Sequence, residues 1–329
     1  MKRVTSSCVV LCAIAVSPVF AAEMESPSAN YPNRVIRIVL PQPAGGGTDT
    51  VTRTIAAKLS EAWGQQVIVD NRAGANGIIG ADAVIKAKAD GYTYLYSFSS
   101  MLAINPAVYK SLPYDTLRDL VPVTKTVTNE MALVVNVYLP VHSVKELVAL
   151  ARARPGDLLY ASFGVGNQTH LTSELFRQEA KLNMLHVPYK GETPSITDVV
   201  GGQVALMFSP SAGVAPFVKS GRLRLLATAG NKRSPAFPDT PTMVESGYPG
   251  VISTGWGGLL APIGTPRDIV QKMARDTARA LSSPDVHERL AILGAEPTPS
   301  TPEEFRAWVK SEMEKWDRVV RAAGLYHTQ

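Results

Sequence analysis

Three consecutive glycines, Gly45, Gly46 and Gly47, stand in the stretch PQPAGGGTDTVTR (Pro41–Arg53). Apolar residues before them predict a strand, and the apolar spacing after them predicts a helix. Such a turn exposes backbone N–H groups that attract an anion, each bond to a carboxylate contributing roughly 1.5–3 kcal/mol. We therefore predict an anion site from Gly45 to Asp49, in which Asp49 turns away and accepts backbone N–H bonds. The alternative is a structural turn capped by Thr48.

A second glycine-rich turn lies in SFGVGNQTHLTSELF (Ser162–Phe176), after another expected strand. Its Gly164-x-Gly166 spacing matches half of a dinucleotide fingerprint, but the third small residue and the later acidic residue are missing. NAD binding is therefore not expected. We predict a second anion-binding helix start, where polar side chains add donors: Ser162, Asn167 and Gln168.

Two further features are candidates for the same site. The segment SFSSMLA (Ser97–Ala103) places hydroxyl groups after a strand, at the edge where α/β sheets bind ligands. A polar loop without a ligand is an equal alternative. Trp256 stands among glycines and is a candidate to face a cleft, whereas His170 is expected to be structural.

The motifs of common enzyme classes are missing. The glycine turn at Gly47 is followed by Thr-Asp rather than Lys-Ser/Thr, which excludes a triphosphate-binding loop. There is no Gly-x-Ser-x-Gly motif and no pair of histidines at zinc-ligand spacing. We therefore expect no catalytic residue, no metal site and no cofactor, although carboxylates paired from distant positions stay open.

The N-terminus predicts export. Lys2 and Arg3 precede a short apolar run, and small residues follow, as in a secretory signal peptide over residues 1–21. Both cysteines, Cys8 and Cys12, lie inside it. Its removal lowers the net charge of +5 by two, to +3, which does not favour nucleic-acid binding. Residues 22–33 are expected to be a short lead-in.

Strands and helices alternate after the lead-in, which predicts an α/β fold with parallel-rich sheets. Thr-Pro pairs predict helix starts capped by Thr265 and Thr301, and a further helix is expected at Asn76–Lys88. Two β-rich runs, Pro122–Asn136 and Val251–Ala261, read as crossings between two domains. The first domain is then expected at residues 34–128 and 254–329, and the second at residues 129–253, with a cleft between them.

Ordered segments across nearly the whole chain resemble the Bug family, the periplasmic receptors of tripartite tricarboxylate transporters. The segments are YPNRVIRIVLPQPAGGGTDTVTR, VIVDNRAGANGIIGADAV, KADGYTYLYS, YASFGVGNQTHLTSELF, HVPYKGETPSITDVVGGQ and PAFPDTPTMVESG. The resemblance implies a two-domain Venus-flytrap protein of the type II kind, without catalytic activity. It also implies a periplasmic location, a small di-, tri- or aromatic carboxylate as ligand, and membrane subunits or a sensor as partners. We expect a monomer.

The resemblance extends the set of expected ligand-binding residues. Backbone donors are implied over Pro43–Asp49 and Ser162–Gln168, and the cleft lining is implied at further positions. With the candidates above, the full set is Ala44, Gly45, Gly46, Gly47, Thr48, Asp49, Ser97, Ser99, Ser100, Met101, Ser162, Phe163, Gly164, Gly166, Asn167, Gln168, Lys190, Ser209, Ser211 and Trp256.

Some residues depart from the family pattern. Phe163 stands where serine is common, which favours an aromatic carboxylate. Ser209 stands where aspartate is common, which disfavours an amino-acid ligand. Glu192 stands where small residues are usual, and we expect it to be a solvated loop charge. A secreted α/β enzyme acting on an acid or ester, and a ligand-sensing adaptor, are the alternatives to a transport receptor.

Overall fold

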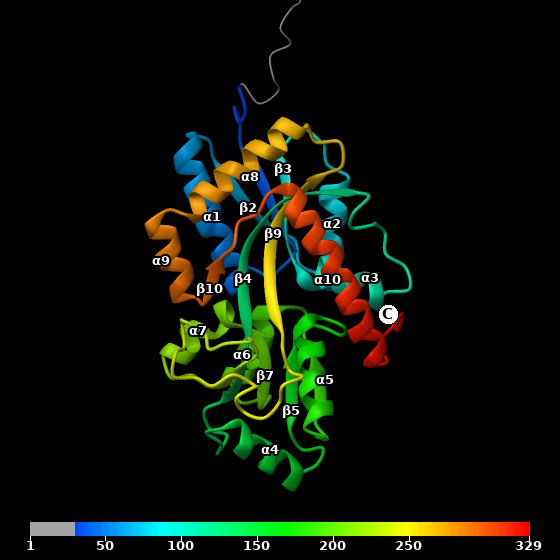
Figure 1. The fold of residues 1–329 in the computed structure, drawn as a ribbon, viewed down its shortest axis with the longest axis vertical. Coiled ribbons are helices and arrows are strands. Elements are labelled where there is room, and N and C mark those ends of the chain that lie inside the picture. Colours follow the sequence, from blue (N-terminus) through cyan, green and yellow to red (C-terminus); the bar gives the residue numbers. More distant parts are fainter. Residues whose placement is uncertain (1–29) are drawn as a thin grey trace, which may run out of the picture.

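The computed structural model describes residues 30–329 and shows an elongated molecule of two parts, one above the other (Figure 1). The predicted signal peptide and residues 22–29 lie outside the described residues. A mixed sheet of ten strands runs through both parts in the order β2-β1-β3-β9-β4-β7-β5-β6, and β8 and β10 pair with β4. Helices flank it, which confirms the predicted α/β fold with two crossing strands.

The strands of the upper part in Figure 1 form a parallel group joined to an antiparallel one. β1 lies between its parallel neighbours β2 and β3, and β3 continues antiparallel to β9. β9 and the short β10 both pair antiparallel with β4. The bounds are β1 Ile36–Leu40, β2 Val67–Asn71, β3 Thr93–Phe98, β4 Leu120–Asn136, β9 Thr254–Pro262 and β10 Ala295–Pro297.

The lower part repeats this arrangement around the far end of β4. β5 is parallel to β6 and β7, while β7 and β8 pair antiparallel with β4. The parallel strands of both parts therefore present their carboxyl ends, and the loops that follow them, toward each other. The bounds are β5 Leu159–Ser162, β6 Leu185–Pro188, β7 Leu206–Pro210 and β8 Leu223–Thr228.

Helices connect these strands and cover the sheet faces. In the upper part they are α1 Gly47–Trp63, η1 Ala75–Gly77, α2 Ile78–Ile85, η2 Ser100–Ile104, α3 Asn105–Val108, α8 Arg267–Leu281, α9 Pro284–Ile292 and α10 Pro302–Ala322. In the lower part they are α4 Val144–Ala153, α5 Gln168–Glu179, α6 Glu192–Val200 and α7 Ser211–Lys219.

The structure confirms one of three predicted helix starts and corrects the other two. Thr301 caps α10 in a reciprocal capping box with Glu304, as predicted. Thr265 does not cap α8, because its hydroxyl donates to Pro262 and Pro266 holds the cap position instead. The helix predicted from Asn76 begins only at Ile78, because Asn76 and Gly77 adopt left-handed φ values of 50° and 91°.

β4 connects the two parts by changing partners along its length. It pairs with β9 from Leu120 to Glu130 and with β7 from Met131 onward. The chain returns just before β9, where the N–H of Met131 donates to the carbonyl of Ser253 at 3.2 Å. Two adjacent extended segments therefore link the parts, the arrangement expected of a hinge.

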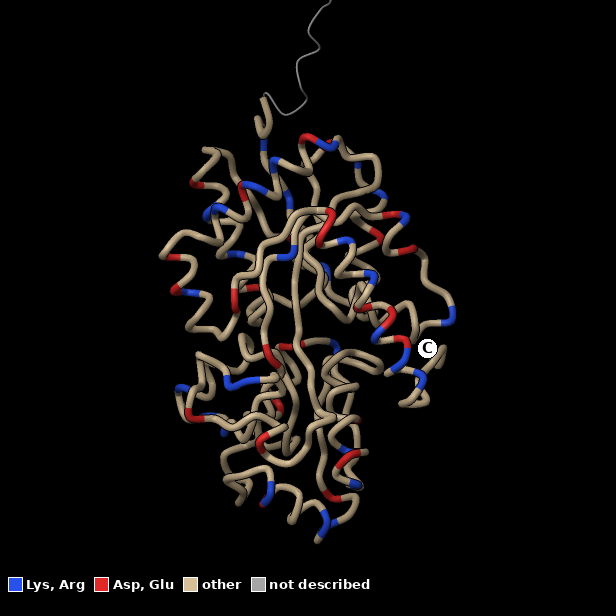
Figure 2. The backbone as a smooth tube through the Cα atoms, in the orientation of Figure 1, with Lys and Arg blue, Asp and Glu red and all other residues tan. Residues whose placement is uncertain are grey.

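The buried apolar residues divide in the same way. Two core clusters are drawn from residues 131–251 alone, and the other two from the remaining residues apart from Ala212 and Leu171. The domain division at residues 128/129 and 253/254 remains our proposal, and this distribution supports it. Charged residues of both signs are spread over the surface (Figure 2). Among residues 30–329, no helix combines the length and apolar character that crossing a membrane needs.

Candidate functional site

Asp49 organises the glycine turn that begins α1. Its carboxylate accepts the N–H of Gly45 at 3.0 Å, and it also receives Nε of Arg53 at 2.9 Å and Nδ2 of Asn71 at 3.0 Å. Burial opposes ionisation, but these bonds outweigh it and hold the pKa of Asp49 below its ordinary value. The prediction that Asp49 turns away to accept backbone N–H bonds is confirmed.

Glu192 lies in the anion position of this turn. Its Oε1 accepts the N–H of Gly47 at 3.1 Å, and the backbone and hydroxyl of Thr48 also favour its charged form. Only 1% of Glu192 is exposed, so the expectation of a solvated loop charge is wrong. Burial raises the pKa of Glu192 above its ordinary value, while the bonds from Gly47 and Thr48 favour the charged form.

The three glycines of the turn meet three different constraints. Gly45 has a left-handed φ of +85° with open space beside it. A Cβ on Gly46 would stand 2.5 Å from Oε2 of Glu192. A Cβ on Gly47 would overlap the backbone of α7, at 2.5 Å from the carbonyl carbon of Ala212 and closer still to Gly213. The absence of side chains at Gly46 and Gly47 therefore leaves room for the Glu192 carboxylate and for the backbone of α7.

The second glycine turn satisfies most of its N–H groups internally. Asn167 caps α5 by accepting the N–H of Thr169 at 3.1 Å, and Thr169 Oγ1 accepts the N–H of Phe163 at 2.9 Å. The N–H of Gly164 donates to Ser162 Oγ, and that of Gly166 donates to His170 Nδ1 at 3.1 Å. An anion at this turn can therefore receive these N–H groups only by displacing the side chains that now accept them.

Two stacked histidines support the second turn. The rings of His170 and His186 lie 3.9 Å apart, and Tyr160 stacks on His186 at 4.9 Å. His186 Nε2 lies 2.6 Å from Ser162 Oγ. Burial lowers the pKa of both histidines, to about 4 for His186, where the neighbouring ring adds to the effect. A neutral His170 can accept from Gly166, which confirms its predicted structural role.

The serine loop after β3 contacts the start of α5. Ser99 Oγ donates to Oε1 of Gln168, and Ser100 Oγ accepts the N–H of Gln168 at 3.0 Å. Ser97 is fully buried and its hydroxyl donates to the sulfur of Met101 at 3.5 Å, so both contribute to packing. The loops of the two parts are therefore in direct contact.

A cavity of about 40 Å³ lies where these loops meet, large enough for only a few waters. Among the described residues, its lining contains no Lys or Arg. Of the predicted residues it includes Thr48, Ser99, Ser100, Phe163, Asn167, Gln168 and Trp256. Residues not predicted complete it: Gln42, Val51, Tyr96, Phe98, Val127, Asn129, Met131, Thr169, Pro210, Gly255 and Gly257.

Two of the additional residues have polar atoms with no partner. Gln42 Oε1 and Asn129 Oδ1 are buried and lack a hydrogen-bond partner among residues 30–329. Gln42 lies two residues after the end of β1, in the same loop as the glycines, so its place in the chain was a usable signal. Asn129 interrupts the apolar run of β4, which the sequence also shows. Both positions mark the wall of the cavity with oxygens able to accept a hydrogen bond from a donor group of a guest.

Other predicted residues do not line this cavity. Lys190 is exposed. Ser211 lies at the start of α7, where its hydroxyl donates to the carbonyl of Gly294 at 3.0 Å across the two parts. Ser209 is fully buried beside it in β7. Trp256, by contrast, does line the cavity, and its indole N–H donates to Glu312 at 2.9 Å.

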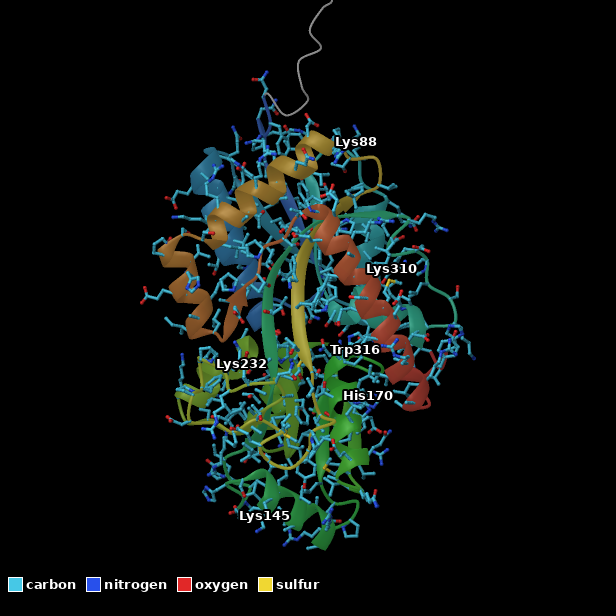
Figure 3. All side chains as sticks on the ribbon, viewed as in Figure 1. Lys88, Lys145, His170, Lys232, Lys310 and Trp316 are labelled. Atoms are coloured by element: carbon cyan, nitrogen blue, oxygen red, sulfur yellow. The ribbon has the colours of Figure 1, made fainter. Side chains whose placement is uncertain are left out.

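A second cavity of about 510 Å³ lies beside β10 and is lined by none of the predicted ligand-binding residues. Its lining includes Glu130, Lys232, His287 and Glu296. Figure 3 shows Lys232 and His170 on opposite sides of the molecule. In the described part of the chain, no group of three or more His, Cys, Asp or Glu side chains is arranged to hold a metal ion.

Comparison with known proteins places this fold in a family. Residues 51–325 match the model described as the tripartite tricarboxylate transporter family receptor. The chain belongs to this receptor family. It is 42% identical over 297 residues to the protein BugT of Bordetella pertussis, covering 89% of this chain and 90% of that relative. The resemblance to the Bug family is thereby confirmed, and the chain is a solute-binding receptor rather than an enzyme.

Solved structures agree with this family membership. An R. palustris protein determined with adipate has a TM-score of 0.87 and 36% identity, covering 89% of this chain and 98% of its own. MatC from Rhodopseudomonas palustris, determined with bound malate, has a TM-score of 0.83 and 30% identity, covering 88% and 100%. The receptor thus shares its architecture with two proteins that hold dicarboxylates.

The contact between α1 and α7 generates a prediction about closure of the receptor. The substitution Gly47→Ala places a methyl group against the backbone of α7, which cannot yield as a flexible side chain can. We expect the two parts to be held further apart. A pair of fluorophores on Lys88→Cys and Lys145→Cys, at opposite ends of the molecule (Figure 3), reports this as a changed transfer efficiency.

The matched control is Gly45→Ala, whose methyl group meets no atom within 4 Å. Its left-handed φ costs about 1–2 kcal/mol of stability without obstructing α7. Equal transfer efficiencies in the two variants would show that the Gly47 contact does not set the spacing.

The stacked histidines generate a prediction about pH. Because the folded pKa of His186 is about 4 against an ordinary value of 6.5, the unfolded chain binds more protons between these values. Stability is therefore present above pH 6.5 and is lost as the pH falls toward 4. We expect His186→Gln to reduce the change in thermal midpoint across this range, measured by calorimetry. His142→Gln, at an exposed position, serves as the control, and identical slopes for both variants would contradict the assignment.

Proposed function

We propose that this chain is a periplasmic receptor that binds a small carboxylate between its two parts and delivers it to the membrane subunits of a tripartite transporter. The observation that carries the proposal is the meeting of three polar loops, after β1, β3 and β5, at one cavity between the parts. Membership of the receptor family and the two relatives that hold dicarboxylates support the same class of ligand.

The lining of the cavity suits an acid with an apolar body. Hydroxyl and amide groups of Ser99, Ser100 and Asn167 can bond to a carboxylate. Aromatic and aliphatic groups face the rest: Val51, Tyr96, Phe98, Met131, Phe163 and Trp256. Neutral donors orient the acid, and burial of its apolar body adds to the affinity.

Binding requires the two parts to separate and close again. A cavity of about 40 Å³ is far below the roughly 300–1,000 Å³ of small-molecule sites, so the loops move to admit a ligand. We assign the hinge to β4 and the return segment before β9, because these two adjacent segments link the parts. A ligand that contacts both parts stabilises the closed form in proportion to its extra contacts there.

The first test measures binding directly. Calorimetric titration of the receptor with benzoate, hexanoate, adipate and malate is expected to give at least one dissociation constant in the micromolar range. Ser99→Ala, which removes a donor from the cavity, is expected to weaken that binding at least tenfold, because a hydrogen bond to a charged group contributes roughly 1.5–3 kcal/mol. Ser311→Ala, on an exposed face of α10, is the control. No heat with any of the four acids would refute the proposal.

A second test addresses the apolar part of the cavity. Phe163 is 7% exposed and lines the cavity beside the start of α5. We expect Phe163→Ala to weaken benzoate more than hexanoate, because an aromatic guest loses a ring contact worth about 0.5–1.5 kcal/mol beyond area burial. Thermal-shift titrations of both acids measure the difference, and an equal loss for the two acids would contradict an aromatic preference.

A further inference from the structure

The carboxylate of Glu192 is bound as a ligand's anion would be. It begins α6 in the lower part, yet its acceptors face the start of α1 in the upper part. It receives the N–H of Gly47 at 3.1 Å, and Thr48 also favours its charged form. Backbone donors at a helix start commonly bind anions. The nearby charge of Asp49 is repulsive, so the helix start and its donors hold Glu192 in place.

The surroundings of Glu192 fit this carboxylate closely. The residue is 1% exposed, and a Cβ on either Gly46 or Gly213 would strike its carboxylate oxygens. α1, α6 and α7 thus enclose it, with glycine on two of the three helices. The next residue in the chain, Thr193, adds a hydroxyl bond to the carbonyl of Ala44 at 3.2 Å. The position is shaped around an acidic side chain of this chain.

Thr48 links this position to the cavity. It directly follows Gly47, whose N–H donates to Glu192, and it also forms part of the cavity lining. A second carboxylate directed to that end of the cavity therefore meets a helix start whose N–H at Gly47 is already occupied by the buried Glu192 carboxyl group. A ligand with one carboxylate can direct it to the loops after β3 and β5 and place a neutral end beside Thr48.

We propose that Glu192 is a specificity-determining residue that fills the anion position at the start of α1 and makes this receptor select monocarboxylates over dicarboxylates. This inference rests on the proposed carboxylate-binding function. The N–H of Gly47 is already taken, so a dicarboxylate has to displace Glu192 and leave its carboxyl group buried without this partner. A monocarboxylate needs no such displacement.

Calorimetric titration of the full receptor with hexanoate and adipate measures this preference, because the two acids share a six-carbon chain and differ in one carboxylate. We expect the wild type to bind hexanoate at least tenfold more tightly than adipate. Glu192→Gln keeps the side-chain size and removes the charge, and Glu192→Ala opens the position. Both substitutions are expected to reduce the ratio of the hexanoate affinity to the adipate affinity at least tenfold. Glu288→Gln, on the exposed face of α9, should leave it unchanged.

A second measurement tests the anion position without the transport ligand. Glu192→Ala removes the CH2–COO⁻ group, which acetate can replace. We expect acetate, but not acetamide, to raise the thermal midpoint of Glu192→Ala more than that of the wild type. An unchanged hexanoate-to-adipate ratio in both variants, or no added effect of acetate, overturns the inference. Acetate rescue in a receptor that binds none of the longer acids would support the role of Glu192 in filling the anion position and refute the proposed function instead.

Discussion

The close approach of two helix starts is the constraint on which the rest of this structure depends. α1 of the upper part and α7 of the lower part meet backbone to backbone at Gly47 and Gly213, with the Glu192 carboxylate between them. A side chain at Gly47 would strike the backbone of α7 and separate the helices, and one at Gly213 would strike the Glu192 carboxylate. The loops after β3 and β5 could then no longer exchange the bonds between Ser100 and Gln168, and the cavity would open to water. The glycines therefore govern the distance between the two parts.

The polar loops satisfy one another when the parts are together. Ser162, Asn167, Thr169 and His170 take up N–H groups of the second glycine turn, while Ser99 and Ser100 bond to Gln168. A buried polar group without a partner costs about 1–3 kcal/mol, so this exchange limits the penalty of closing on a small cavity. A ligand gains affinity only by the difference between its own bonds and those it replaces. The unpartnered oxygens of Gln42 and Asn129 are acceptors, which a hydroxyl or amine group of a ligand can satisfy but a carboxylate cannot.

Local sequence patterns predicted much of the fold, but they did not predict contacts between segments that are distant in the chain. Strand–turn–helix repeats follow from apolar spacing and caps, and Asp49 was foreseen because its partners Gly45 and Arg53 lie on the same turn. Glu192 was misjudged because a charged residue in a Gly-Glu-Thr-Pro loop looks solvated. Its burial depends on Gly47, which is 145 positions away in the chain. The start of α2 failed for a local reason, since Asn76-Gly77 accepts left-handed backbone more readily than a helix. Which of the predicted ligand residues contact a guest is a question of spatial arrangement that spacing alone does not encode.

The absence of Lys and Arg from the described lining of the cavity bears on how such a receptor can release its cargo. If the ligand carboxylate were paired with a buried cation, release of the ligand would leave that cation without a partner, at a cost of several kcal/mol unless water reached it at once. Hydroxyl and amide donors cost far less to expose, and here they have partners in their own loops to return to. The buried carboxyl group of Glu192 at the junction belongs to the protein and occupies a donor at the start of α1. In the proposed mechanism it disfavours a second carboxylate, while neutral donors supply the attraction, so that hinge motion alone can release the ligand.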